Sequence, residues 1–194
     1  MKYIGLILTG CLLGQWLYHL AWKLCAYQEG GVKQKRLSEM FGAILLVSLE
    51  NRFGLETSHF YFFLGLFILL LLASDMDLMI YAFDVRIIDI LWGLSLGKFL
   101  LLQVSWLESV LSLIFFYILF QALLKGMAIC LNSEGMGEGD VAIFLLLAFI
   151  FGFYPTLWIV LVSCLLAIPF SFHGKIPYVP FISVACLIVI CFFL

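Results

Sequence analysis

Two aspartates offer the clearest chemistry in this chain, and each stands at one end of an apolar run. Asp75 ends the run from Phe60 to Ala73, and Asp140 begins another run behind a glycine-rich segment. A carboxylate at the border of a membrane is costly unless it has a function. Two carboxylates a few ångströms apart share one proton near neutrality, because they cannot easily both ionise. One member of such a pair can activate water while the other polarises a carbonyl, which is the chemistry of peptide hydrolysis.

The segment before Asp140 is the most informative stretch of the sequence. Gly135, Gly137 and Gly139 occupy every second position and lead directly into the carboxylate. Glycine lets a backbone turn tightly and approach another chain closely. Asp140 is then expected in the first turn of a hydrophobic helix, beside exposed N–H groups and the positive end of the helix dipole. We expect the three glycines to shape this turn rather than to bind a ligand.

Other acids compete for the role of Asp75. Asp77, Asp84 and Asp89 lie in the same connection or in the following helix. All four acids are also compatible with a solvated loop in which Asp84 pairs locally with Arg86. Spacing alone therefore leaves the partner of Asp140 open among these residues.

The composition requires a lipid solvent. Of the 194 residues, 65% are hydrophobic and 11% are charged, and the mean hydropathy is +1.20. No soluble domain of this size has an interior large enough to bury so much apolar surface. We therefore predict one all-α membrane domain over residues 1–194, a polytopic bundle of about eight transmembrane segments with short loops. The expected apolar segments are 3–24, 39–50, 58–74, 86–104, 108–131, 140–153, 155–172 and 177–194.

The residue types also argue against two classes of partner. The ten basic residues form no long run, which argues against a nucleic-acid partner. The expected surrounding is the lipid bilayer, as the composition indicates. The six cysteines form no CxxC pair and have no histidine at ligand spacing, so we expect no metal site. His19, His59 and His173 are scattered, and we assign them no catalytic or ligand role. The oligomeric state stays open.

The basic residues predict which membrane face the two aspartates share. Cytoplasmic connections carry an excess of Lys and Arg. If every segment crosses the membrane, seven of the ten basic residues fall in or beside the odd-numbered connections. This assigns the odd-numbered connections to the cytoplasm. It also puts Asp75 and Asp140 at one depth, near the inner surface of the cytoplasmic membrane.

Several motifs resemble those of a known family. Residues 134–140, EGMGEGD, closely resemble the GxGD signature of type IV prepilin peptidases, the membrane aspartyl proteases that process pilins and pseudopilins. Residues 10–17 look like that family's first span, and Arg36–Glu39 is similar to its entry to the next span. Residues 176–181, IPYVPF, resemble its C-terminal IPfxPf motif and are most like the short Gram-positive competence enzymes. Together these stretches cover nearly the whole chain in the expected order.

The resemblance implies catalytic roles for Asp75 and Asp140. In the family, the first aspartate ends a span and is followed about seven residues later by a proline, often behind Tyr or Ile. Here Tyr81 and Ala82 follow Asp75 in that register, with alanine in place of proline, whereas Asp77 is out of register. The separation of Asp75 from Asp140 is also similar to the family's. Asp75 is therefore the expected first catalytic carboxylate.

Six further residues receive weaker roles. Glu39 either lines the site or pairs with Arg36, and we favour the pairing. Pro177 and Pro180 either open the backbone for substrate or only terminate helices. Gly135, Gly137 and Gly139 complete this set as loop-shaping residues.

The chain also departs from the family pattern. Many relatives carry two CxxC pairs in the first cytoplasmic loop, a structural zinc site. Here only Tyr27 to Lys35 remains of that loop, and it holds no cysteine. Many relatives also methylate the new pilin N-terminus with S-adenosylmethionine. Because the loop is missing, we expect peptidase activity without zinc or any other cofactor, and S-adenosylmethionine would be needed only if the methyltransferase activity is retained.

The expected function is that of an intramembrane aspartyl endopeptidase that removes a basic leader from a prepilin or pseudopilin. Two alternatives belong to other classes of protein. A catalytically inactive relative could act as a membrane scaffold for pilus-like assembly, but a scaffold has no need of both carboxylates. A small proton-coupled transporter is expected to hold its acids near mid-bilayer, whereas these two acids are expected at the ends of spans.

Overall fold

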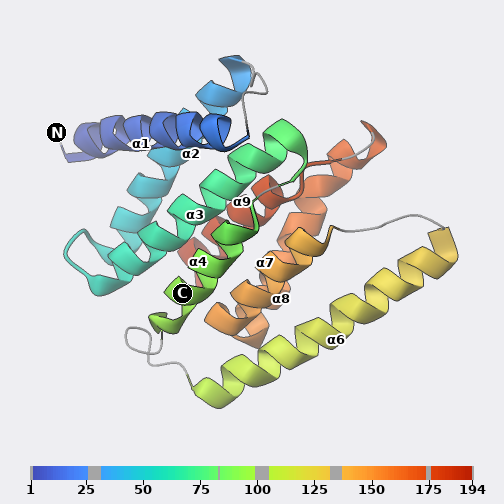
Figure 1. Cartoon of the computed structure of the whole chain (residues 1–194). Coiled ribbons are helices and arrows are strands. Elements are labelled where there is room, and N and C mark those ends of the chain that lie inside the picture. The colour runs from blue at the N-terminus through green and yellow to red at the C-terminus, as the bar shows by residue number, and fades with distance from the viewer. Residues whose placement is uncertain are drawn as a thin grey trace.

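The computed structural model describes residues 2–25, 32–82, 84–98, 105–131, 137–173 and 176–193. Within these ranges the chain is all-helical, as the sequence predicted, and each expected apolar segment overlaps at least one helix (Figure 1). The helices are α1 (Lys2–Leu24), α2 (Val32–Phe53), α3 (Ser58–Ile80), α4 (Val85–Leu96), α6 (Trp106–Leu131), α7 (Glu138–Phe151), α8 (Phe153–Ala167), the 3₁₀ helix η1 (Ile168–His173) and α9 (Val179–Phe193).

Four helices of the described chain are long and apolar enough to cross a membrane. They cover Tyr3–Leu24, Ser58–Ile80, Trp106–Gly126 and Phe153–Phe170. The described helices therefore do not support the prediction of about eight transmembrane segments. The 12 residues of α4 and the 14 of α7 extend about 18 and 21 Å, short of an apolar bilayer core of about 30 Å. The apolar pattern located the helices approximately, but it does not measure where a helix ends: α4 stops at Leu96. Residues 99–104 of the expected segment lie outside the described residues.

The first two helices are in backbone contact. A Cβ atom added to Gly10 would lie 2.5 Å from the Cα of Ala43, and one added to Gly14 would lie 2.2 Å from the carbonyl oxygen of Ser38. On the facing helix, a Cβ at Gly42 would lie 2.2 Å from the carbonyl oxygen of Gly10. Small residues four apart are the usual means by which helices approach this closely in a membrane. This contact fixes α2, and with it Ser38, against α1.

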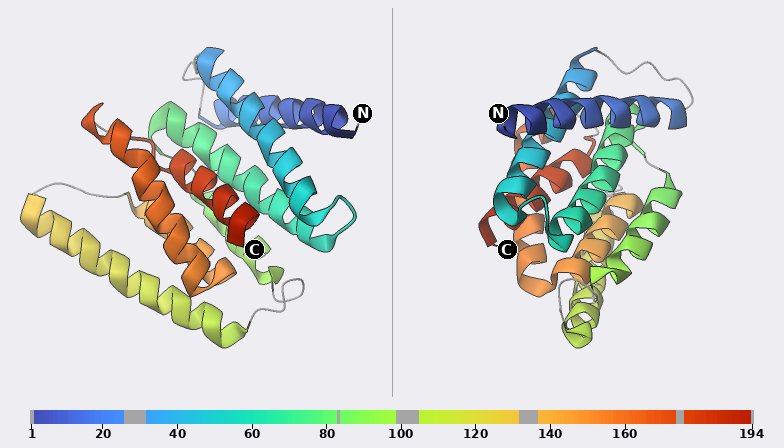
Figure 2. Two further views of the ribbon diagram at one scale, coloured as in Figure 1. Left: turned by 180° about the vertical axis from the view of Figure 1, so that it is seen from behind. Right: turned by 90° about the vertical axis from the view of Figure 1, so that its left-hand side faces the viewer.

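Helix α3 forms the centre of the bundle. It packs against α1, α2, α4 and α9, and its buried residues run from Phe60 to Asp77 (Figure 1). Helix α9 lies beside it, and two views of the ribbon show α7 and α8 on the side away from α1 (Figure 2). Because α3 is covered on several sides, acidic residues near its end are shielded from lipid. The protein interior, rather than the bilayer, is therefore their environment.

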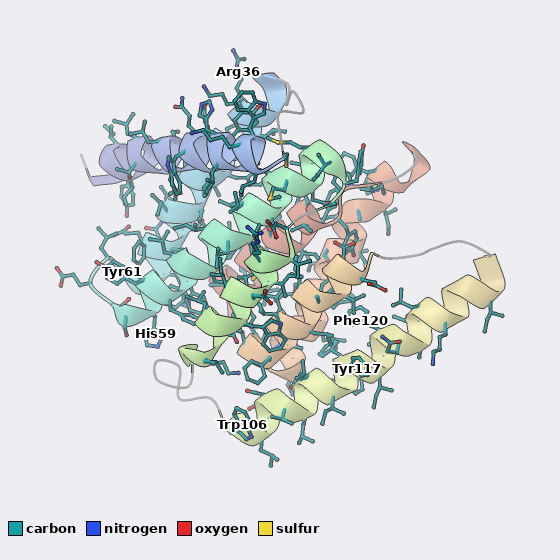
Figure 3. All side chains as sticks on the ribbon, in the orientation of Figure 1. Arg36, His59, Tyr61, Trp106, Tyr117 and Phe120 are labelled. Carbon is teal, nitrogen blue, oxygen red and sulfur yellow. The ribbon has the colours of Figure 1, made fainter. Side chains whose placement is uncertain are left out.

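Helix α6 lies at the outer edge of the bundle (Figures 1 and 2). Trp106 and Tyr117 are exposed, whereas Phe120 is buried and stacks on Phe144 of α7 with ring centroids 5.2 Å apart (Figure 3). Exposed apolar side chains continue along this helix at Leu107 and Leu111, among others. So much exposed apolar surface on one helix marks a contact with lipid or with another protein, and contact with lipid agrees with a membrane protein.

A buried lysine ties the far end of α7 to two other elements. The Lys98 ammonium, after α4, donates hydrogen bonds to the carbonyls of Phe149 and Ile150 and to the Ser109 hydroxyl of α6. Burial lowers the pKa of Lys98 to about 8, although the nearby Glu108 carboxylate raises it. The last carbonyls of a helix lack partners within it, and a cation there also faces the negative end of the dipole. Lys98 therefore caps α7 at the end opposite Asp140.

We expect Lys98→Met to lower the free energy of unfolding by about 3 kcal/mol, since the variant loses several charge-assisted hydrogen bonds in a buried setting. Thermal unfolding in detergent measures the effect. Lys125→Met is the matched control, because Lys125 is exposed on α6. Equal melting temperatures for the two variants would contradict the role of Lys98 as a cap.

Candidate active site

Asp75 lies inside α3 rather than at its end. The helix continues to Ile80 and is terminated by Tyr81, whose backbone is left-handed with φ of 53°. The expected end at residue 74 is therefore too early. The helix runs past its first acidic residue because the side chains of Asp75 and Asp77 are both buried against other helices, with 4% and 6% of their surface exposed. Both carboxylates are surrounded by protein, so the chain need not leave the helix at Asp75 to expose a charge to water.

The Asp75 carboxyl contacts α2 through a serine. The Ser38 hydroxyl lies 2.9 Å from Oδ2 of Asp75 and 2.9 Å from the carbonyl oxygen of Gly14. A hydroxyl carries one hydrogen, so Ser38 donates a full hydrogen bond to only one of these two oxygens at a time. Ser38 donates to Asp75 when the carboxyl is ionised, and it accepts from a protonated Asp75 while donating to Gly14. Both protonation states of Asp75 therefore have a partner, as an acid–base residue requires.

A small cavity adjoins Asp75 where α2, α3 and α9 converge. Its volume is about 30 Å³, room for about two water molecules. Most of its lining is apolar, and its polar members are Ser38, Ser74, Asp75 and Ser183. Ser74 and Ser183 are hydrogen-bonded to each other at 2.8 Å and connect α3 to α9. The cavity therefore offers space for a hydrolytic water beside a carboxylate.

Asp140 lies in the first turn of α7, and Gly137 before it leaves room for its carboxylate. Gly137 is the N-cap residue, and the Asp140 carboxyl, three residues on, turns back to accept a hydrogen bond from its N–H. This is one half of a capping box. A Cβ atom at Gly137 would lie 3.3 Å from Oδ2 of Asp140, so glycine gives the carboxylate room to turn back. The prediction of Asp140 in the first helical turn is confirmed.

Burial raises the pKa of the Asp140 carboxyl to about 7. The negative charge of Asp77 raises it further, whereas the hydrogen bond from Gly137 lowers it. The group therefore gains and loses its proton near neutral pH, which is the range in which a catalytic acid or base is effective. Asp140 lies outside the four helices that are long enough to span the membrane.

Asp77 is buried on another side of α3. Its Oδ2 accepts a hydrogen bond of 3.0 Å from the backbone N–H of Val179, the first residue of α9, and Asp77 also accepts one from the backbone of Tyr178. Residues two apart on a helix point in different directions. Accordingly Asp75 faces Ser38 of α2, whereas Asp77 faces the start of α9 and acts electrostatically on Asp140.

The remaining predicted site residues fall into three groups. Gly135 lies outside the described residues, and Gly139 is half-buried in the first turn of α7. Glu39 is half-exposed on α2 and forms no ion pair with the exposed Arg36, so the pairing we favoured is wrong. Pro177 precedes α9, and Pro180 lies in its first turn and lines the cavity beside Asp75.

The other competing acids have structural or solvated positions. Asp84 caps α4, since its Oδ1 accepts a hydrogen bond of 2.9 Å from the backbone N–H of Arg86, and Asp89 is exposed. Within the described ranges, no three His, Cys, Asp or Glu side chains gather as metal ligands would. The competition for the role of first carboxylate is thereby reduced to Asp75 and Asp77.

The structure brings Asp77 of α3 close enough to Asp140 to act on its charge. Arg36 and His59 lie toward opposite ends of the bundle (Figure 3). The specific pairing of Asp75 with Asp140 stays a prediction. Sequence reasoning missed Ser38 and Tyr178 as neighbours of these acids and set Asp77 aside on register. The sequence did carry a signal for both residues, because Ser38 and Tyr178 belong to two of the stretches that resemble the prepilin peptidases.

Comparison with known proteins finds no relative of this chain. No protein-family model matches the chain, and searches of curated proteins and of solved structures find no match. The resemblance to prepilin peptidases therefore rests on the motifs quoted above.

Proposed function

We propose that this protein is a membrane-embedded aspartic endopeptidase that removes the short basic leader from a type IV prepilin or competence pseudopilin. The observation that carries the proposal is that two carboxylates are buried near the end of α3, and one of them, Asp77, acts electrostatically on Asp140 at the start of α7. Burying several carboxylates is costly, so their gathering calls for a chemical role. The GEGD segment before α7 supplies the link to this class of protease.

In the proposed reaction, Asp75 and Asp140 share one proton. The ionised member takes a proton from water, which attacks the scissile carbonyl, while the protonated member polarises that carbonyl. The peptide C–N bond breaks, leaving a carboxylate on the leader and a free amine on the processed pilin. Which aspartate begins protonated is a property of the pair. Since Asp75 now contacts Ser38 and Asp140 contacts Gly137, we expect both side chains to turn toward each other when substrate binds.

The membrane contributes to positioning. The proposed substrate carries a basic leader that ends in glycine and is followed by a hydrophobic helix in the bilayer. Holding that helix in the bilayer restricts the scissile bond to one depth, so much of the cost of orientation is met before the chemical step. We propose that the site faces the cytoplasm, following the distribution of Lys and Arg.

The proposal is tested by co-expression with a tagged pseudopilin and by measuring leader removal by gel shift and N-terminal mass. We expect cleavage after the leader glycine. The mass also reports any N-methyl group, which would show that the chain retains a methyltransferase activity dependent on S-adenosylmethionine. If well-inserted protein cleaves none of several pseudopilins, the proposal fails and the inactive scaffold becomes the better account.

A further inference from the structure

We infer that Asp77 is a positioning residue, whose buried carboxylate holds the start of α9 in place beside the aspartate of α7. This inference concerns the same site as the proposed function and rests on that function for its kinetic consequence. Its structural part, the anchoring of α9, is independent of any activity.

The anchor is a helix cap supplied from a distant part of the chain. The first N–H groups of a helix have no partner within it and attract negative charge. The residues before α9 provide no Ser, Thr, Asp or Asn to fill this role, since the sequence there is IPYV. Asp77 of α3 fills it instead, accepting hydrogen bonds from Val179 and Tyr178. Pro180 has no N–H, so these two donors are the ones the first turn must satisfy.

The segment that Asp77 holds packs against α7 close to Asp140. The ring of Tyr178 packs against Phe144, one helical turn beyond Asp140, with centroids 6.1 Å apart. The Tyr178 hydroxyl lies 3.3 Å from the Ser163 hydroxyl and 3.1 Å from the Cys164 sulfur, both on α8. Tyr178 therefore joins three helices, and its backbone is held by Asp77. Releasing that backbone is expected to loosen α9 from the start of α7.

The charge of Asp77 gives the anchor a second effect, on the protonation of Asp140. Negative charge nearby favours the protonated form of a carboxyl group. Among the described residues, Tyr178 is a further titratable group that interacts electrostatically with Asp140 across helices. The charged residues of the neighbouring helices, Arg86 and Asp89 of α4 and Lys125 of α6, are exposed, as is Glu138 of α7 itself. Removing the Asp77 charge is therefore expected to lower the pH at which Asp140 titrates.

Two variants separate the anchor from the charge. Asp77→Asn keeps the shape and one acceptor oxygen but removes the charge, whereas Asp77→Ala removes both. Hydrogen exchange of the 176–184 segment, measured by mass spectrometry in detergent, reports the anchor without any substrate. We expect the Val179 amide to exchange at least tenfold faster in Asp77→Ala, and Asp89→Ala, which changes an exposed acid of α4, to leave it unchanged. Unchanged exchange in Asp77→Ala would overturn the anchor.

The pH dependence of leader cleavage reports the charge. We expect Asp77→Asn to cleave within about tenfold of wild type at its own optimum, with the limb that titrates Asp140 displaced by about half to one pH unit toward lower pH. The direction is the same whether Asp140 acts as acid or base, because in both cases its pKa falls. A profile identical to wild type would overturn the electrostatic role.

Two further results would also decide the matter. If Asp77→Asn cleaves at no pH while its exchange stays normal, Asp77 acts in the chemical step itself, and its role as a positioning residue is wrong. If the wild-type protein cleaves no prepilin, the proposed function fails, and the exchange experiment alone still accepts or rejects the anchor.

Discussion

Replacing either proposed catalytic aspartate by asparagine is expected to abolish leader cleavage, with a loss of at least about 1,000-fold for Asp75→Asn and for Asp140→Asn. The amide keeps the size of the side chain but can neither take a proton from water nor hold the shared proton. Because the pair works as a unit, the double variant is expected to lose no more than either single variant. The measurement is conversion of a tagged pseudopilin in membranes, followed over time.

The control for this experiment is Asp89→Asn, which changes an exposed acid of α4 and is expected to keep wild-type cleavage. Membrane insertion and thermal unfolding of each variant show whether a loss of activity comes from chemistry or from folding. Full activity in Asp75→Asn would remove that residue from the catalytic pair. Loss in Asp77→Asn in the same experiment would then assign the pair to Asp77 and Asp140.

The second large effect is expected from a single methyl group at the contact between α1 and α2. Gly14→Ala places a Cβ atom 2.2 Å from the backbone carbonyl oxygen of Ser38, which no side-chain movement can relieve. The two helices must separate, and we expect a loss of about 3 kcal/mol in unfolding free energy. Cleavage should fall as well, because Ser38 moves away from Asp75.

Gly5→Ala is the matched control on the same helix. A Cβ atom at Gly5 has nothing within 4 Å, so the change brings no clash. Alanine also favours a helix over glycine by about 0.5–1 kcal/mol. The two substitutions are therefore expected to move the melting temperature in detergent in opposite directions. A Gly14→Ala protein as stable as wild type would show that α1 and α2 do not pack as closely as the structure has them.

The candidate site connects these two predictions. Gly14 lets α2 approach α1, the approach brings Ser38 to Asp75, and Asp75 adjoins a cavity that also contacts α9 through Pro180. Asp77 then holds the start of α9 beside Asp140. Packing of apparently remote helices is thus expected to control the geometry of the acids. Effects of substitutions along this path should not be additive, since the residues are in contact.

The number of membrane crossings illustrates a limit of hydropathy. All eight expected segments form helices, yet four of the described helices are long and apolar enough to span a membrane alone. Helices α4 and α7 have only 12 and 14 residues. A polar or short helix is stable inside a bundle because its neighbours, and not lipid, surround its backbone.

The sequence by itself predicted the all-helical class, the approximate position of the helices and the placement of Asp140 in a first turn behind glycine. These properties depend on local composition and on residues a few positions apart, which a sequence displays directly. It also singled out Asp75 among four acids, through a motif register that awaits the cleavage experiment.

Only the tertiary structure decided which neighbours the acids have. Ser38 is 37 residues from Asp75, and Val179 is 102 residues from Asp77, so neither contact has a local signature. Asp75 and Asp77 are nearly identical in local sequence context, but the turn of the helix directs them to different partners. The expected pairing of Glu39 with Arg36 was also wrong, because proximity in sequence does not by itself bring two charged side chains into contact.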